Sequence, residues 1–218
     1  MEEVGPSMAN AAPKTRRRRV NGDASHQRIL SAATEIAAER GYEGTSIALV
    51  SERSGLPASS IYWHFKDKDA LLAAVIDHSF QSWLASAGGA AAEVIRGPVA
   101  EKLTVMMQAT ARALQESSDF LRLGLMLTLE KRDAEPSARR RFLEVRHEAV
   151  QRTVSTYATL FPKLDQDALR QLSTFTMAAA DGLFIASEID GTDEGTMAAF
   201  ELLAVAVLGV ARHLQRTT

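Results

Sequence analysis

The sequence of 218 residues contains no cysteine, which excludes disulfide bonds, thiolate metal sites and cysteine nucleophiles and suits a reducing cytoplasm. It has no uninterrupted run of about eighteen apolar residues, so a membrane-spanning helix is not expected. The N-terminus has no apolar segment after its charges and does not resemble a secretory signal. No glycine-rich phosphate loop and no Ser/His/Asp order stands out, so neither a cofactor nor an enzymatic activity is expected.

What is present is an ordinary soluble composition with an uneven distribution of charge. Apolar residues make up 46% and charged residues 24% of the chain, enough for a core without a disulfide or metal. From Lys14 to Lys68, ten basic and six acidic residues give a balance of +4, whereas the remainder has fifteen basic and twenty-one acidic residues, or −6. A basic DNA-binding domain (the head) joined to a more acidic partner-binding domain would have such a division of charge. A difference of this size also arises by chance.

Apolar periodicity and helix boundary signals predict an all-α protein of about nine helices in three parts. Residues 1–24 have no apolar periodicity and predict a disordered basic tail containing the run Arg16–Arg19. Residues 25–72 predict three short helices and the start of a fourth, and residues 73–218 predict a larger helical domain. The predicted helices are Ser25–Gly41, Thr45 or Ser46 to Ser54, Pro57–His64, Lys66 or Asp67 toward Leu84, 98–117, 119–129, 135–162, 165–188 and 193–216.

The segment from Val50 to Tyr62 has the pattern of a helix-turn-helix. Gly55 supplies the left-handed backbone that a tight bend between two helices needs, and Leu56 tucks inward behind it. The second helix then presents short side chains followed by aromatic ones, a surface suited to a major groove. The residues of this surface are Ala58, Ser59, Ser60, Tyr62 and Trp63.

Three parts of this region resemble the head of the TetR family of transcriptional regulators. They are Gly41–Ser46, the pair Gly55-Leu56 and Ile61–Leu72, and the spacing agrees from Ser25 to Val75. The resemblance implies a sequence-specific DNA-binding regulator. The resemblance further implies that this regulator is a cytoplasmic homodimeric repressor, which a small apolar effector releases from a pseudo-palindromic operator.

The resemblance also implies DNA contacts for nine residues. Thr45 and Ser46 would contact phosphate at a helix N-terminus, and His64 and Lys68 would hold flanking phosphates. The other five are the exposed residues of the second helix, Ala58, Ser59, Ser60, Tyr62 and Trp63.

Four residues depart from the family pattern and leave the operator sequence open. Ser51 and Ser54 stand where alanine is usual, Pro57 stands where serine usually caps the recognition helix, and Ser59 stands where glycine is usual. The run Arg16–Arg19 either enters a minor groove or attracts any duplex without reading its sequence, and we favour the second interpretation.

The larger domain is expected to bind the effector and to dimerise. Eleven residues of its central helices are candidates for the effector pocket: Met106, Met107, Thr110, Phe120, Leu123, Met126, Leu127, His147, Tyr157, Asp181 and Phe184. The last two predicted helices carry apolar stripes that could form a four-helix bundle across a two-fold axis or face only their own chain. These stripes are Leu169, Leu172, Phe175, Ala179, Leu183 and Ala186, and Phe200, Leu203, Val207, Val210 and Leu214.

Three other interpretations compete with this one. The spacing Glu144-x-x-His147 is that of ferritin-like diiron bundles, but no second such pair exists in the chain. A regulator that responds to a protein would have a filled core without a pocket. A non-specific DNA-binding protein would rely on Arg16–Arg19 and bind any duplex, with a steep dependence on salt.

Overall fold

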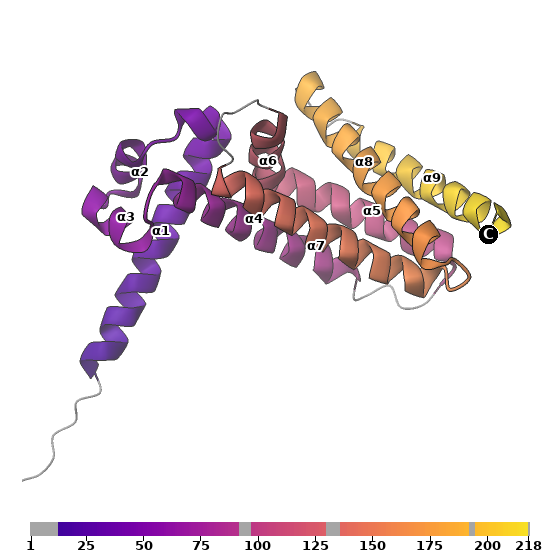
Figure 1. Cartoon of the computed structure of the whole chain (residues 1–218), viewed down its shortest axis with the longest axis horizontal. Helices are drawn as coiled ribbons and strands as arrows, with labels where there is room; N and C mark the ends of the chain where they lie inside the picture. The colour runs from indigo at the N-terminus through magenta and orange to yellow at the C-terminus, as the bar shows by residue number, and fades with distance from the viewer. Residues whose placement is uncertain (1–12, 92–96, 130–135, 192–194, 218) are drawn as a thin grey trace, which may run out of the picture. The chain divides into compact units, whose positions relative to one another are not determined.

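The computed structural model describes residues 13–91, 97–129, 136–191 and 195–217, and within these ranges it contains nine α-helices and no strand (Figure 1). The predicted all-α class and its nine helices are therefore confirmed. The helices are α1 (Pro13–Gly44), α2 (Ile47–Ser54), α3 (Ala58–His64), α4 (Lys68–Ala91), α5 (Val99–Glu116), α6 (Asp119–Leu129), α7 (Ser137–Leu160), α8 (Gln166–Asp190) and α9 (Thr196–Thr217).

The chain forms two compact units, and the boundary between them lies inside α4, between Leu72 and Ala73. The first unit contains α1, α2, α3 and the first turn of α4. Its core consists of apolar residues at helical spacing, among them Ile29, Ile36, Val50 and Ile61, each with an exposure of 2% or less. Burial of these side chains supplies the main stabilisation of this unit, because α2 and α3, with eight and seven residues, are too short to be stable alone.

The first helix begins earlier than predicted, and it is interrupted at its predicted end. It begins at Pro13 rather than at Ser25, so residues 13–24, predicted to be disordered, are helical, while residues 1–12 lie outside the described part of the chain. Arginine and alanine favour helices, and the absence of an apolar stripe in this segment did not reveal that preference. Near the other end, Gly41 has φ 68° and interrupts the helix at the residue where the prediction ends it.

The second unit is a bundle of the remaining helices. The helix α9 packs on α5 and α8, and α7 packs on α6 and α8, as Figure 1 shows. Fully buried side chains from separate helices form its core, among them Phe80, Leu103, Tyr157 and Phe200. On α4, Phe80 stacks on Trp83, and both rings contact Phe120 of α6. These aromatic contacts connect the middle of α4 to α6.

Two helices of this unit correct expectations from the sequence. The helix α4 continues to Ala91 through a segment whose glycines predicted a break after Leu84. By length and composition alone, α9 is apolar enough to cross a membrane, although Glu201 and Arg212 interrupt its apolar run. One face of α9 packs in the core through Phe200, yet only 28% of its most apolar window is buried. Most of this apolar surface is therefore not covered by the chain itself.

Candidate DNA-binding head and effector cavity

The turn between α2 and α3 is held by hydrogen bonds from side chains. Gly55 has φ 64° and ends α2 in the left-handed conformation that the bend requires. Ser51 Oγ donates to the carbonyl of Leu56 over 2.7 Å, and the N–H of Leu56 donates to Ser54 Oγ over 3.3 Å. Ser51 and Ser54, which stand where alanine is usual in the family, therefore both bind the backbone of Leu56, directly after Gly55. The sequence indicated only that they are small.

The helix α3 presents two aromatic side chains to solvent. Tyr62 is 56% exposed and Trp63 is 75% exposed, whereas Ile61 between the helices is fully buried. Ser59 is also exposed, and Ala58 and Ser60 are partly exposed. Large exposed aromatic rings are unusual on a protein surface unless they meet a partner. The residues predicted to read DNA thus lie on the open face of a short, firmly held helix.

The two residues at the start of α2 have different environments. Ser46 is the N-cap, and its Oγ accepts from the N–H of Leu49 over 3.3 Å, so its own hydrogen stays available to a phosphate. Thr45 is only 1% exposed, and its Oγ1 donates to the carbonyl of Gly41 over 2.7 Å. The Thr45 side chain therefore stabilises the end of α1 and is too deeply buried to contact phosphate.

His64 and Lys68, the predicted phosphate contacts on the flank, both have partners inside the head. His64 Nε2 lies 2.9 Å from Ser25 Oγ, and its ring meets those of His26 and Trp63 edge-on. Partial burial, with a smaller effect from the charge of His26, holds the pKa of His64 below its usual value.

Lys68 binds the end of α1 through three contacts. Its Nζ donates to the carbonyl of Tyr42 over 3.1 Å, lies 3.6 Å from Glu43 Oε2, and sits 4.4 Å from the centre of the Tyr42 ring. The lysine therefore anchors α4 to α1 within the head. A contact between Lys68 and phosphate would have to compete with these partners.

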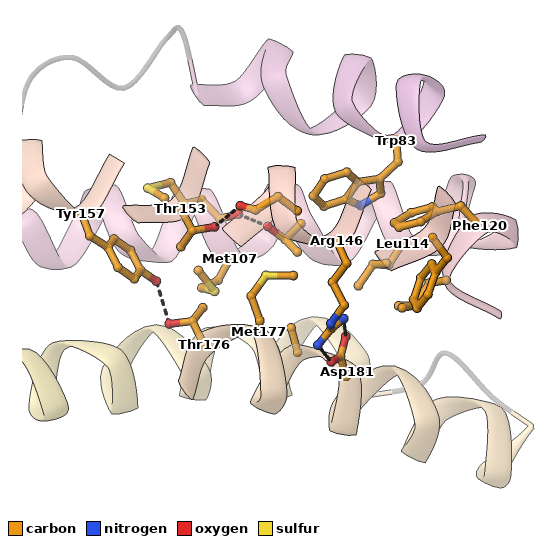
Figure 2. A pocket seen from close by; sticks show the side chains of 16 residues that line it. Trp83, Met107, Leu114, Phe120, Arg146, Thr153, Tyr157, Thr176, Met177 and Asp181 are labelled. Atoms are coloured by element: carbon orange, nitrogen blue, oxygen red, sulfur yellow. Dashed lines mark hydrogen bonds and ion pairs between the residues drawn. The ribbon is translucent and has the colours of Figure 1, made fainter. Parts of the chain in front are cut away.

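A cavity of about 110 Å³ lies within the second unit, between α4, α5, α6, α7 and α8 (Figure 2). Six of the eleven predicted pocket residues line it: Met106, Met107, Thr110, Phe120, Tyr157 and Asp181. The other five do not. Leu123 and Leu127 are buried in the core, Met126 is half-buried outside the lining, His147 is exposed, and Phe184 lines a separate cavity of about 90 Å³.

An ion pair crosses the wall of the larger cavity. The guanidinium of Arg146 binds both carboxylate oxygens of Asp181, with Nη1 donating to Oδ1 over 3.0 Å (Figure 2). Their side chains are 29% and 16% exposed, so the pair is largely removed from water. Such a pair is neutral overall, and breaking it would leave one partly buried charge without a partner.

The hydroxyl groups in the lining are also paired. Tyr157 Oη lies 2.9 Å from Thr176 Oγ1, and because Thr176 donates to the carbonyl of Leu172, the tyrosine is the donor of this bond. Burial raises the pKa of Tyr157 to about 12, so the group is neutral at physiological pH. Thr110 and Thr153 donate to the carbonyls of Met106 and Ala149, one turn earlier on their helices.

Several residues of this lining were not predicted from the sequence. Trp83, Arg146, Thr153, Thr176 and Met177 all face the cavity. A usable signal did exist for Arg146, because it lies four residues after Phe142 and three before Ala149 on the inward face of α7. A charged residue on an apolar stripe indicates a buried partner, whereas His147, one position further along the helix, points outward.

The carboxylate and histidine that resembled a diiron site lie outside the bundle core. Glu144 is 56% exposed at its side chain and pairs with Arg141, and His147 is exposed. In the described ranges, no group of three or more His, Cys, Asp or Glu side chains is arranged to hold a metal.

A helix-turn-helix with exposed aromatics, joined to a helical bundle, is the architecture of a DNA-binding regulator. Comparison with known proteins agrees with this class. Residues 29–75 match the family model for bacterial regulatory proteins of the tetR family. The chain is 31% identical over 170 residues to the HTH-type transcriptional repressor AcnR of Corynebacterium diphtheriae, covering 77% of this chain and 82% of AcnR.

Two further relatives illustrate how far the similarity extends. An HTH-type transcriptional repressor of Mycobacterium tuberculosis is 33% identical over 72 residues, which is 33% of this chain and only 28% of the relative's length. The structure of the regulator FadR from Bacillus subtilis in complex with stearoyl-CoA superposes with a TM-score of 0.62 and 19% identity, covering 82% of this chain and 97% of FadR. This last likeness concerns the fold alone.

The chain therefore belongs to the TetR family. It is a DNA-binding transcriptional regulator, and its family is not a family of enzymes.

Proposed function

We propose that this protein is a cytoplasmic homodimeric repressor that binds a pseudo-palindromic operator and leaves it when a small effector enters the 110 Å³ cavity. The observation that carries the proposal is the exposed pair Tyr62 and Trp63 on a helix fixed by the turn at Gly55. Tyr62 contacts base edges or the sugar–phosphate backbone with both its ring and its hydroxyl. Trp63 contacts the backbone beside it.

The remaining DNA contacts follow from the accessibility of the head residues. Ser46, Ala58, Ser59 and Ser60 are exposed or partly exposed and are retained as contacts. To contact phosphate, His64 gives up its hydrogen bond with Ser25. Lys68 contacts phosphate only when its hydrogen bond to the carbonyl of Tyr42 breaks. Thr45 acts indirectly, because its hydroxyl holds the end of α1 just before α2.

A second copy of the chain covers the apolar faces of α8 and α9. The predicted stripe residues Leu169, Leu172, Phe200, Leu203 and Val207 are buried within one chain, so they do not form the dimer contact. Phe175 of the predicted α8 stripe is exposed, and so are four apolar side chains outside the stripes: Ile185 and Ile189 on α8, and Leu202 and Val205 on α9. Two such faces would form the four-helix bundle of an isologous dimer. Paired recognition helices then meet successive turns of the duplex.

The switch acts through α4. Phe120 lines the cavity and contacts Phe80 and Trp83, both on α4, while Arg141 of α7 binds Asp77 on the same helix. An effector that displaces Phe120 favours another position of α4, and because α4 continues into the head, the two heads no longer match the operator.

Two classes of effector are candidates. The cavity lining is mostly apolar and contains methionines, which adapt to ligands of varied shape, and this favours a small apolar effector. Acyl-CoA is the second class, because FadR of Bacillus subtilis, which has the same fold, was solved with stearoyl-CoA.

A cavity-filling substitution tests the switch without knowledge of the effector. Ala149→Leu adds three carbons to the lining from α7 and should imitate a bound ligand. We expect about a ten-fold or greater loss of affinity for a duplex selected by the wild-type protein, corresponding to a coupling of about 1.4 kcal/mol or more. Ser155→Leu places the same side chain on the exposed face of α7 and should leave the affinity unchanged. Unchanged affinity in a folded Ala149→Leu variant would contradict the switch.

A further inference from the structure

The indole of Trp83 has a buried hydrogen-bond donor without an acceptor. Its Nε1 atom is inaccessible to solvent, and no acceptor for it exists among the residues that the structure describes. Trp83 lines the 110 Å³ cavity, and Figure 2 shows its ring nitrogen on the side that faces the cavity. Buried N–H groups are nearly always paired, so an unpaired one at a cavity wall indicates an absent acceptor.

The other uncharged polar groups of the lining have already donated their hydrogens. The hydroxyls of Thr110 and Thr153 donate to helix carbonyls, and Tyr157 donates to Thr176, which itself donates to a carbonyl. Among the described lining residues, the indole N–H is therefore the uncharged donor left for a ligand. A ligand that satisfies it must carry an accepting oxygen or nitrogen.

The pair of Arg146 with Asp181 determines which ligand charge the cavity tolerates. Both side chains are largely shielded from water, so the field of each is weakly screened. An anionic ligand would have to displace Asp181 from the guanidinium and then remain beside its carboxylate. A cationic ligand meets the same difficulty at Arg146, whereas an uncharged ligand leaves the pair intact.

The volume limits the size of the ligand. About 110 Å³ is somewhat less than the roughly 150 Å³ of an engineered apolar cavity that binds benzene. The space therefore suits one aromatic ring or a group of similar size. A long acyl chain would require the bundle to open.

We propose that the cavity binds an uncharged molecule of about one aromatic ring that carries a hydrogen-bond-accepting oxygen, and that Trp83 Nε1–H donates to this oxygen. The inference rests on the proposed function, because it specifies the effector class of the same cavity. Trp83 thereby becomes a specificity-determining residue. It lies on α4, so the hydrogen bond acts on the helix that continues into the head.

Four probes test this class on the full-length protein. Acetophenone has the ring and the accepting oxygen, ethylbenzene has the ring alone, benzoate adds a negative charge, and stearoyl-CoA is the long-chain alternative. Affinities are measured by calorimetry, and the Trp83 Nε1–H resonance is followed by ¹H–¹⁵N NMR. Acetophenone should move this resonance downfield and ethylbenzene should not. In Trp83→Phe, acetophenone should lose about five-fold more affinity than ethylbenzene, the value of one hydrogen bond.

A second variant tests the role of the ion pair. Benzoate should bind wild-type protein at least about ten-fold more weakly than acetophenone. Asp181→Asn frees Arg146 and should raise the affinity for benzoate, while the affinity for acetophenone stays within about two-fold.

The failures of the two proposals are distinguishable. Equal losses of acetophenone and ethylbenzene in Trp83→Phe, or tighter binding of benzoate or stearoyl-CoA to wild-type protein, would overturn the ligand class and leave the cavity as a binding site. If none of the four probes bound, the ligand class would be overturned, whereas the switch is tested separately by Ala149→Leu.

Discussion

The ring of Phe142 on α7 occupies the space that any side chain at Gly124 on α6 would need. A Cβ at Gly124 would lie 2.0 Å from Cδ2 of Phe142, far closer than two carbon atoms can approach. Phe142 is almost fully buried and lines the 110 Å³ cavity from the other side. The glycine therefore allows α6 and α7 to pack closely and positions one wall of the cavity.

Replacing Gly124 by alanine should destabilise the protein and disturb the cavity. The methyl group must push Phe142 toward the cavity, and overpacking of this kind costs about 1–3 kcal/mol, partly offset by the better helix propensity of alanine. Urea unfolding measures the loss. Gly22→Ala is the control, because a Cβ at Gly22 meets no atom within 4 Å. Equal stability of the two variants would show that α6 and α7 separate freely.

Replacing Ser51 by alanine should weaken the turn of the head. The substitution removes the hydrogen bond to the carbonyl of Leu56, which contributes about 1 kcal/mol. The control is Ser59→Ala, at an exposed position on α3. It makes the same change in helix propensity but does not remove the hydrogen bond to Leu56. Thermal unfolding should therefore give Ser51→Ala a free energy of unfolding about 1 kcal/mol lower than that of Ser59→Ala. The opposite order would mean that Ser51 contributes through its small size alone and not through this hydrogen bond.

The stability of the head should depend on pH through His64. Its pKa in the folded protein is lowered by partial burial and by His26, so the unfolded chain binds a proton at a higher pH than the folded chain does. This contribution is fully present above the unfolded pKa of about 6.5 and is lost as the pH falls below it. Chemical unfolding between pH 7.5 and 5.5 measures how the free energy of unfolding changes with pH. The substitution His64→Gln should make this dependence weaker. An unchanged pH dependence in His64→Gln would contradict the assignment.

Enlarging Gly209 should dissociate the proposed dimer without damaging a single chain. A Cβ at Gly209 meets no atom of its own chain within 4 Å, and the residue follows Leu202 and Val205 on the exposed face of α9 at helical spacing. In Gly209→Leu the added side chain would keep two such faces apart. Sedimentation equilibrium should therefore give a monomer with unchanged helical content, whereas Ser155→Leu stays dimeric. A dimeric Gly209→Leu would place the contact on another surface.

The sequence predicted the helices well because their boundaries carry local signals. Gly55 and Ser46 act at single positions on the chain, and their conformations in the structure are those that a turn and an N-cap require. Side-chain partners depend on which helices meet. Thr45 and Lys68 were assigned to phosphate because of their positions in a motif, but each binds the end of α1.

The cavity was harder to predict for the same reason. The helical spacing of an inward-facing apolar residue is the same whether the residue lies in the core or lines a cavity. The sequence therefore did not distinguish Leu123, which lies in the core, from Met107, which lines the cavity. Trp83 was not predicted because the candidates came from the central helices, whereas this residue lies on α4. The exposed faces of α8 and α9 differ in part from the predicted stripes. These helices pack on each other, and α8 also packs on α7 and α9 on α5, which decides which face remains open.

The central claim, sequence-specific DNA binding through the exposed face of α3, is tested most directly by selection from a randomised duplex library. The bound DNA is sequenced after selection with wild-type protein and with Tyr62→Ala at the same moderate salt concentration. We predict recovery of a pseudo-palindrome by the wild type and its loss in Tyr62→Ala, with half-sites about one helical turn apart. Uniform recovery of all sequences by the wild-type protein would contradict the account and leave only non-specific attraction by basic residues.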